Sequence, residues 1–225
     1  MTSFVLKIIG IVTMLCDHTS DAIIGRFSFL NLIGRFAFPI FAFQTVNGYT
    51  HTKDLKKYLI RLLVFALISQ IPFMLFLSTY QKDMSLNVFF TFILGILALL
   101  LYDKVNNKIF GTIGVISISI LAELIKVDFG AFGILTIFLF YIFKDNKLKM
   151  IIPYILLCFI KYIPDIINMP AAYLIYIKLS IFTAIPIEFI IFYNNKQGPK
   201  LKYLFYIFYP LHLIILWAIH TFLLK

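Results

Sequence analysis

The sequence predicts an all-α protein, a polytopic transmembrane helix bundle of about nine spans. The first observation behind this is composition: 62% of the 225 residues are hydrophobic and only 13% are charged. Soluble domains carry about 25% charged and about 45–50% apolar residues. The second is that the apolar residues form continuous runs, and a bilayer requires each such run to bond its backbone internally, as a helix does. The third is that lysines gather between the runs.

The apolar runs have the length that crosses a bilayer as a helix. A hydrocarbon core of about 30 Å takes about 20 helical residues. By this measure we expect spans at 4–24, 29–48, 57–77, 86–102, 109–126, 129–143, 149–167, 171–193 and 201–224. The shortest, 129–143, has a re-entrant segment as its alternative. Because neither a repeat nor a soluble stretch interrupts the pattern, we expect 1–225 to be a single integral membrane domain.

Lysine-rich and lysine-poor connections alternate along the chain. The rich ones hold Lys53, Lys56 and Lys57; Lys104 and Lys108; Lys144, Lys147 and Lys149; and Lys196, Lys200 and Lys202. The poor ones hold one basic residue each: Arg26, Lys82, Lys126 and Lys161. Basic loops remain on the cytoplasmic side. We therefore expect the N-terminus inside and the C-terminus outside, and we assign the net charge of +10 to membrane orientation rather than to nucleic-acid binding.

Two further residue types bear on the spans. Prolines lie within or at the ends of several of them and are expected to kink their helices; they are Pro39, Pro72, Pro153, Pro164, Pro170, Pro186 and Pro210. Cys16 and Cys158 both lie in apolar runs, where they are expected to pack rather than to form a disulfide or bind metal. The first run lacks a cleavage site and is expected to be a retained helix.

The first two spans carry charged residues inside apolar sequence. Each charge near a bilayer centre costs at least about 2.5–3.5 kcal/mol, so several together indicate a site. Lys7 lies near the cytoplasmic end of the first span, and Asp17 and His18 follow roughly 15–17 Å deeper along a helix. Histidine accepts and returns protons near neutral pH. The polar residues at 19–21 allow an alternative, a shorter first helix that ends at the outer surface.

Arg35 lies in the second span and must pair or line a wet cavity there. Gly34 beside it lets a neighbouring helix approach closely. One interpretation of Arg35 is a clamp for an anion or a carboxylate. The alternative is a structural ion pair with Asp17 or Glu123. Asp17 could instead orient His18 and raise its basicity, so both pairings of Asp17 stay open.

The stretch 51–61 is the most basic of the chain. Anchoring to anionic lipid explains its lysines. A phosphorylated cofactor arriving from the cytosol would nevertheless meet this rim, where Lys57 and Arg61 lie.

Weaker candidates lie further along. Asn87 and Thr91 are one helical turn apart and could hydrogen-bond across helices. His212 follows a proline in the last span, where packing is the alternative to a functional role. No set of His, Cys or carboxylate residues has metal-ligand spacing, so no metal is expected.

Over most of its length the chain resembles the TraX family, named for a conjugal-pilus acetylation protein. The resemblance lies in these residues: Leu6–Ile9, Asp17, His18, 33–43, Gly48, His51, Thr52, Tyr58, Arg61, Leu62, 65–72, Asn87, Phe90, Thr91, 128–133 and 209–212. It implies N-acetylation of a pilin from acetyl-CoA at the membrane. TraX is similar in turn to membrane acyltransferases that carry a basic residue, ten residues and a histidine in the first helix. Lys7 and His18 match this, with lysine where arginine is usual.

The resemblance and the buried charges together lead us to expect an enzyme, an N- or O-acyltransferase of the bacterial cytoplasmic membrane. It would move an acyl group, which the resemblance implies is acetyl, from cytoplasmic acyl-CoA to a protein N-terminus or an envelope glycan or lipid. We expect His18 and Asp17 to be catalytic, with Arg35 fixing geometry. Donor contacts are expected from Lys7, Arg35, Lys57 and Arg61, and substrate contacts from Asn87, Thr91, Asp128 and His212. The alternative is a small-molecule transporter with a midplane polar site.

Overall fold

The computed structural model describes residues 1–25, 27–81, 84–199 and 202–224, with the backbone alone at Lys202. Within these ranges all regular structure is helical, apart from one isolated bridge between Leu86 and Val127, so the predicted all-α class is confirmed. The chain divides into two compact units, which we describe separately. The first comprises Met1–Phe41 and Asp145–Lys225, and the second comprises Ala42–Lys144. A single membrane domain stays a prediction.

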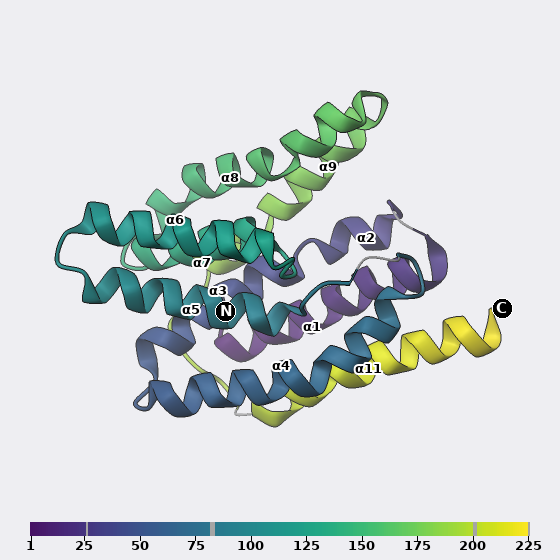
Figure 1. Ribbon diagram of the computed structural model, residues 1–225, viewed down its shortest axis with the longest axis horizontal. Coiled ribbons are helices and arrows are strands. Elements are labelled where there is room, and N and C mark those ends of the chain that lie inside the picture. The colour runs from purple at the N-terminus through teal and green to yellow at the C-terminus, as the bar shows by residue number, and fades with distance from the viewer. Residues whose placement is uncertain (26, 82–83, 200–201, 225) are drawn as a thin grey trace. The chain divides into compact units, whose positions relative to one another are not determined.

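The helices follow one another along the whole chain (Figure 1). The first unit contains α1 (Ser3–Thr19), the π-helix η1 (Ser20–Ile24), α2 (Phe29–Gly34), the start of α3 (Ala37–His51), α8 (Lys147–Asn168), the 3₁₀ turn η2 (Pro170–Ala172), α9 (Tyr173–Ala184), α10 (Pro186–Ile191) and α11 (Lys202–Leu223). The second unit contains the rest of α3, α4 (Leu55–Leu77), α5 (Val88–Lys104), α6 (Lys108–Leu124) and α7 (Gly130–Ile142).

Each of the nine predicted spans coincides with a helical segment. In the described part of the chain, six segments are long and apolar enough to cross a membrane: Ser3–Ile24, Phe29–His51, Leu55–Leu77, Lys147–Asn168, Pro170–Ile191 and Tyr203–Leu223. Helices α5 and α6 have 17 residues each, and α7 has 13. The membrane character of the protein is therefore confirmed, whereas the count of nine, the span at 129–143 and the orientation stay predictions.

The first helical segment is continuous from Ser3 to Ile24. Thr2 begins it, since its side-chain hydroxyl accepts a hydrogen bond from the Val5 N–H. Helix α1 itself ends at Thr19, directly after Asp17 and His18, and the π-helical turn Ser20–Ile24 continues the helical segment beyond them. The depth of Asp17 and His18 in the membrane stays a prediction.

Two prolines coincide with breaks in predicted spans. Pro39 opens the first turn of α3, and its ring would clash with the carbonyl of Arg35 four residues earlier if the helix were continuous. The chain accordingly leaves α2 at Gly34 and re-forms a helix at Ala37. Pro186 separates α9 from α10 in the same way. The helices continue through the other prolines that lie inside them, Pro72, Pro153, Pro164 and Pro210, and a kink at these four stays a prediction.

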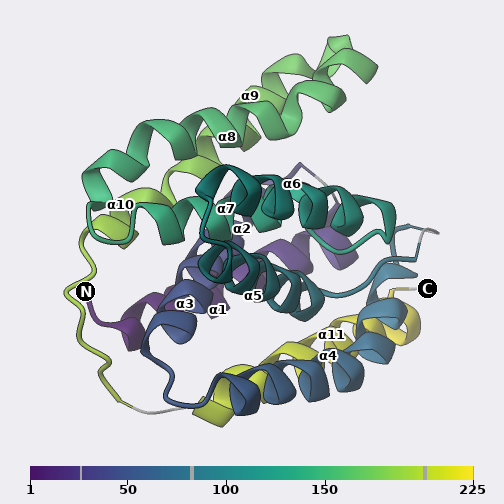
Figure 2. The ribbon, with the colours of Figure 1, turned by 60° about the vertical axis from the view of Figure 1, so that its left-hand side comes forward.

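In the first unit, α8 and α9 form a long hairpin (Figures 1 and 2). The buried Tyr154 hydroxyl donates to the Thr183 carbonyl at 2.7 Å and fixes the two helices together. The extended connection after α10 runs beside the N-terminus (Figure 2). There the N–H groups of Ser3 and Phe4 donate to the carbonyls of Lys196 and Gln197 at 2.9 and 3.0 Å.

The second unit packs α5, α6 and α7 against one another. Their shared core contains Ala98, Val115, Ala122, Val127 and Ile134. Gly130 begins α7 with a φ of +41°, and a side chain there would collide with the Glu123 carboxylate. That carboxylate accepts the Ala131 N–H at 2.8 Å, so Glu123 caps α7.

The basic residues that predict orientation are only partly described. Arg26, Lys82 and Lys200 lie outside the described residues, as does the side chain of Lys202. Lys126 lies in the turn between α6 and α7, as expected. Lys161 was expected in a turn but lies within α8, because the helix continues to Asn168.

Candidate functional site

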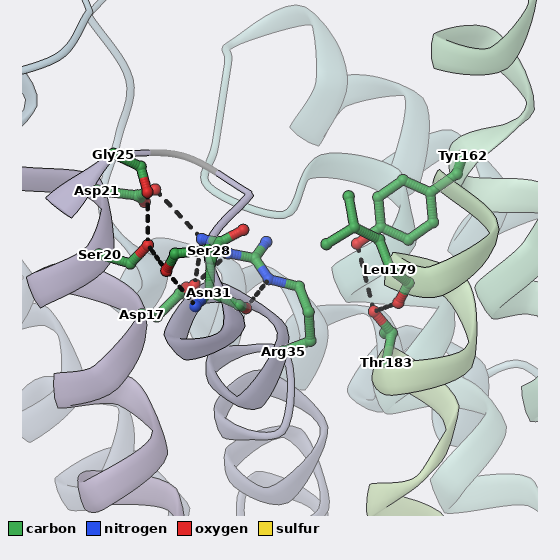
Figure 3. A network of polar contacts seen from close by, with 10 residues as sticks. All are labelled: Asp17, Ser20, Asp21, Gly25, Ser28, Asn31, Arg35, Tyr162, Leu179 and Thr183. Atoms are coloured by element: carbon green, nitrogen blue, oxygen red, sulfur yellow. Dashed lines mark hydrogen bonds and ion pairs between the residues drawn. The ribbon is translucent and has the colours of Figure 1, made fainter. Parts of the chain in front are cut away.

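Polar side chains from α1 and α2 meet around the carboxylate of Asp17 (Figure 3). Its Oδ1 accepts from the guanidinium of Arg35 and, at 2.8 Å, from the amide of Asn31. The Arg35 Nε also donates to the Asn31 carbonyl at 3.2 Å. The Asp17 and Arg35 side chains are only 15% and 19% exposed. Of the two pairings left open by the sequence, Asp17 therefore makes the one with Arg35.

Gly34 allows this pairing. A Cβ built on Gly34 would overlap the Asp17 side chain and lie 2.6 Å from its Cα, a backbone atom that cannot move aside easily. Only glycine lets α2 approach α1 this closely, as the sequence predicted. Since Arg35 follows directly, the break after α2 also lets its side chain turn back toward Asp17.

A second set of polar groups extends the network toward the end of the π-helix (Figure 3). The Asn31 side-chain amide donates a second hydrogen bond to the Asp21 carboxylate at 3.2 Å. Ser20 donates to the Gly25 carbonyl at 2.8 Å, so the 2.6 Å contact between Ser20 and Ser28 has Ser28 as donor. Single π-helical turns inside α-helices often accompany functional sites.

Tyr162 of α8 lies on the other side of Arg35, with its hydroxyl directed toward it (Figure 3). The Thr183 hydroxyl donates to the Leu179 carbonyl at 2.7 Å. It must therefore accept from the Tyr162 hydroxyl, 3.3 Å away. This contact holds the Tyr162 ring in place and leaves its oxygen lone pairs on the side of the guanidinium.

His18 points to a different neighbour, since consecutive residues of a helix diverge by about 100°. Its Nδ1 lies 2.7 Å from Nε2 of His212 in α11. The His212 side chain is buried, and its Nδ1 lies 2.8 Å from the Phe208 carbonyl. The structure thus joins two candidate residues that are 194 positions apart in the sequence.

Lys7 lies on the same face of α1 as His18. Eleven residues make about three full turns, so the two side chains project the same way. The Lys7 ammonium lies 5.4 Å from the centre of the Phe205 ring in α11, one of the helices that pack against α1. The seam between α1 and α11 therefore has a cation toward one end and a pair of imidazoles roughly 15–17 Å further along.

The basic rim at the start of α4 belongs to the second unit. The Lys57 side chain is 84% exposed, and its ammonium lies 3.3 Å from the Asp54 carboxylate. The Lys57 N–H donates to Asp54 at 2.9 Å and holds the pKa of that carboxyl below its usual value. Arg61 packs its guanidinium 5.4 Å from the centre of the Tyr58 ring. Asp54 thus neutralises part of the positive charge of this rim, and contact of Lys57 and Arg61 with a phosphorylated donor stays a prediction.

Three expected substrate residues also lie in the second unit, where they support helix packing. The Asn87 side chain is fully buried and donates to the Ala66 carbonyl and to Gln70, at 2.8 and 2.9 Å. The Thr91 hydroxyl donates to the carbonyl of Asp128. These contacts give Asn87 and Thr91 a structural role, and substrate contact by any of the three stays a prediction.

No group of three or more His, Cys, Asp or Glu side chains in the described part of the chain could hold a metal ion. Both cysteines are free, and Cys158 is buried.

Comparison with known proteins decides the family. The TraX protein family matches residues 3–220, nearly the whole chain. The chain belongs to the TraX family. It is also 27% identical over 241 residues to the "Probable fimbrial assembly protein FimC, serogroup H1" of Dichelobacter nodosus, covering 99% of this chain and 97% of that protein. No solved structure matches.

Sequence reasoning missed several members of the network in this TraX-family protein, among them Asn31 and Tyr162. A signal for Asn31 was present. Asp17 and Asp21 are four residues apart, as are Asn31 and Arg35, so each pair lies on one helix face. Tyr162 carried no such signal, because a tyrosine near a span end is ordinary in a membrane protein.

Proposed function

We propose that this TraX-family membrane protein is an acyl-CoA-dependent acyltransferase, acting on acetyl-CoA, with His18 as its general base. The observation that supports this best is the hydrogen-bonded pair of His18 and His212, on the face of α1 that also carries Lys7. A half-buried imidazole beside a second, buried imidazole can take up and return a proton. The Asp17–Arg35 pair next to it fixes the geometry of α1 and α2.

The proposed reaction is transfer to an amine or a hydroxyl. The nitrogen or oxygen of the acceptor attacks the thioester carbonyl carbon, and its proton moves to the imidazole of His18. The carbon–sulfur bond then breaks, its electron pair leaves with the CoA sulfur, and the thiolate takes the proton back from His18. General-base assistance of this kind is worth about 10²–10⁴-fold in rate, and positioning of the two substrates supplies the rest.

Lys7 and the rim at Lys57 and Arg61 are the proposed donor contacts. Acyl-CoA carries several negatively charged phosphates and a long pantetheine arm that ends at the thioester. An ammonium on the same face of α1 as His18, about three helical turns away, suits a donor that lies along α1 with its thioester at the imidazole. Arginine and lysine side chains both bind phosphates, arginine with the more fixed geometry.

The acceptor we propose is the N-terminal amine of a cell-envelope protein, such as a pilus subunit. The support is the relative whose name refers to fimbrial assembly, which matches along almost its full length. A glycan hydroxyl and a lipid headgroup offer similar nucleophiles and are the competing acceptors.

The proposal is tested with purified protein in lipid vesicles and acetyl-CoA labelled in the acetyl group. A peptide with a free N-terminus, an oligosaccharide and an amine-bearing lipid are supplied in turn, and label on each acceptor is measured with the release of free CoA thiol. We expect the amount of labelled acetyl group on the peptide to equal the amount of free CoA thiol released. Label that enters the vesicles as intact acetyl-CoA, or label that reaches none of the acceptors, would contradict acyl transfer.

A further inference from the structure

The rings of His18 and His212 meet edge to edge in nearly one plane. They are tilted by only 7°, with centroids 5.0 Å apart, while the facing nitrogens are 2.7 Å apart. The centroid distance exceeds the nitrogen–nitrogen distance by about the sum of the two distances from a ring centre to its own nitrogen. Both nitrogens must therefore lie on the line that joins the ring centres. Face-to-face stacking is thereby excluded. This is the geometry of an in-plane N–H···N hydrogen bond, with the lone pair of one ring aimed at the N–H of the other.

The Phe208 carbonyl determines which nitrogens carry protons. A carbonyl oxygen can only accept, so the His212 Nδ1 that lies 2.8 Å from it must be an N–H. A neutral imidazole has a single N–H, which leaves Nε2 of His212 as an acceptor. The His18 Nδ1 facing that Nε2 must then be the donor. The one nitrogen of His18 left with a lone pair along its ring plane is Nε2.

The two rings cannot both be charged. Two cations with centres 5.0 Å apart repel, and their facing N–H groups would collide at a nitrogen separation of 2.7 Å. The pair can hold one extra proton, however. When His18 Nε2 takes up a proton, the proton between the rings can shift from His18 Nδ1 to His212 Nε2, which places the charge on His212. His18 Nε2–H is then the group that returns a proton to a leaving thiolate.

Neighbouring aromatic rings fix the plane of His212. The Phe208 ring lies almost parallel to it, tilted by 11° at a centroid distance of 4.6 Å. Tyr209 lies 5.8 Å away at 60°. The Phe208 ring thus packs against the face of the His212 ring, while the two His212 nitrogens contact the Phe208 carbonyl and His18.

We infer that His212 is a positioning residue that fixes the tautomer of His18 with Nδ1 protonated and Nε2 unprotonated, so that Nε2 is the atom that accepts the proton of the acceptor. This inference rests on the proposed function for the role of that proton. The proton arrangement itself follows from the Phe208 carbonyl and the ring geometry. His212 was expected from the sequence to contact substrate, and the structure favours a contact with the base instead.

The direct test is the nitrogen NMR spectrum of the full-length protein with ¹⁵N-labelled histidine. The chain has four histidines, so the His18 and His212 signals are assigned by removing His51 and His220 in turn. We expect neutral His18 to be protonated at Nδ1 in the wild type, with His212 protonated at Nδ1 as well. In His212→Phe, His18 should lose this preference and show the Nε2-protonated form. His18 protonated at Nε2 in the wild type, or an unchanged tautomer in His212→Phe, would overturn the inference.

Kinetics separate positioning from packing. Phenylalanine fills the space of His212 without an acceptor, whereas His212→Gln offers an amide oxygen to the His18 Nδ1–H. We expect kcat to fall at least 10-fold in His212→Phe with KM for acetyl-CoA little changed, and His212→Gln to recover a large part of the loss. Equal losses in both variants, or none in either, would overturn the positioning role.

His220 supplies the matched control. It also lies on α11 and also places Nδ1 near a backbone carbonyl, that of Ala22 at 2.5 Å, but it has no hydrogen bond to His18. His220→Gln should leave the His18 tautomer and kcat unchanged. If the wild type has the inferred tautomer but transfers no acetyl group, the proton arrangement stands and the proposed function fails. The wild-type spectrum therefore tests the inference even if a substituted protein does not fold.

Discussion

Asp17 illustrates how a single carboxylate is assigned among competing partners. Arg35 offers a charged donor and Asn31 an amide donor, and both reach the same oxygen atom of Asp17. Hydrogen bonds to charged groups are stronger than neutral ones by about twofold. His18 is adjacent in sequence but projects about 100° away around the helix. Charge and direction therefore both favour the pairing with Arg35, and His18 finds its partner on α11 instead.

Removing one partner of this pair is expected to destabilise the protein. Arg35→Ala should lower the free energy of unfolding by about 3 kcal/mol, the lower end of the range for buried pairs, because both side chains are slightly exposed. Arg35→Gln combined with Asp17→Asn removes both charges and should recover much of this loss. Denaturant titration in mixed micelles measures the three variants.

The exposed pair Lys57–Asp54 is the control, since it is wet and screened. Lys57→Gln removes the charge pair but leaves the Lys57 N–H that Asp54 caps, and it should give no measurable change in stability. If the Arg35/Asp17 double variant is as unstable as the sum of its single changes, the two residues do not form a coupled pair.

At the scale of the helix, local irregularities create the site. The π-helical turn after α1 lies between Asp17 and Arg35 in the chain, and the break between α2 and α3 falls at Arg35 itself. The sequence predicted that Pro39 would disturb its span, but not that the break would fall at Arg35. Fixing that position requires knowing that α2 lies against α1 at Gly34, which is tertiary information.

Gly34→Ala tests the close approach of these two helices. The added methyl group would overlap Asp17, so α2 must move away and the contact between Arg35 and Asp17 must lengthen. Overpacking of this kind costs about 1–3 kcal/mol, and we expect this loss together with reduced turnover. Gly10→Ala in α1 is the control, because its Cβ would meet only side-chain atoms, the edge of the Phe41 ring at 3.0 Å and Cγ2 of Ile40 at 3.4 Å. Equal stability of the two variants would show that α1 and α2 do not need glycine here.

For the whole molecule, hydropathy was sufficient to place the helices because bilayer thickness fixes their length. All nine predicted spans coincide with helical segments. The same reasoning could not find the contact between His18 and His212, since their separation of 194 residues leaves no periodic signal in one sequence. It also could not divide the chain into two compact units, because the division falls inside the apolar helix α3.

Orientation is testable by labelling single cysteines from outside the cell. After replacement of Cys16 and Cys158, cysteines are introduced at Lys53, Asn106, Asp145 and Lys196, which are exposed and on the expected cytoplasmic side. We expect an impermeant thiol reagent to label none of them in intact cells and all of them after lysis.

Ser78→Cys and Asn168→Cys are the matched sites on the expected outer side and should be labelled in intact cells. If the reagent labels 145 and 196 in intact cells but not 53 and 106, then 129–143 does not span, and the loops after it lie on the side opposite to the one expected.

The central claim is that His18 moves the proton in acyl transfer. The most direct test is the turnover number of a variant in which only His18 is replaced. Acetyl transfer to the accepted substrate is compared between wild type and His18→Ala, with His220→Ala as the control histidine on α11. The account predicts at least about a 100-fold loss of kcat for His18→Ala, the lower bound for a general base, in a protein that still inserts and folds. A His18→Ala protein that keeps more than about a tenth of wild-type turnover would contradict it.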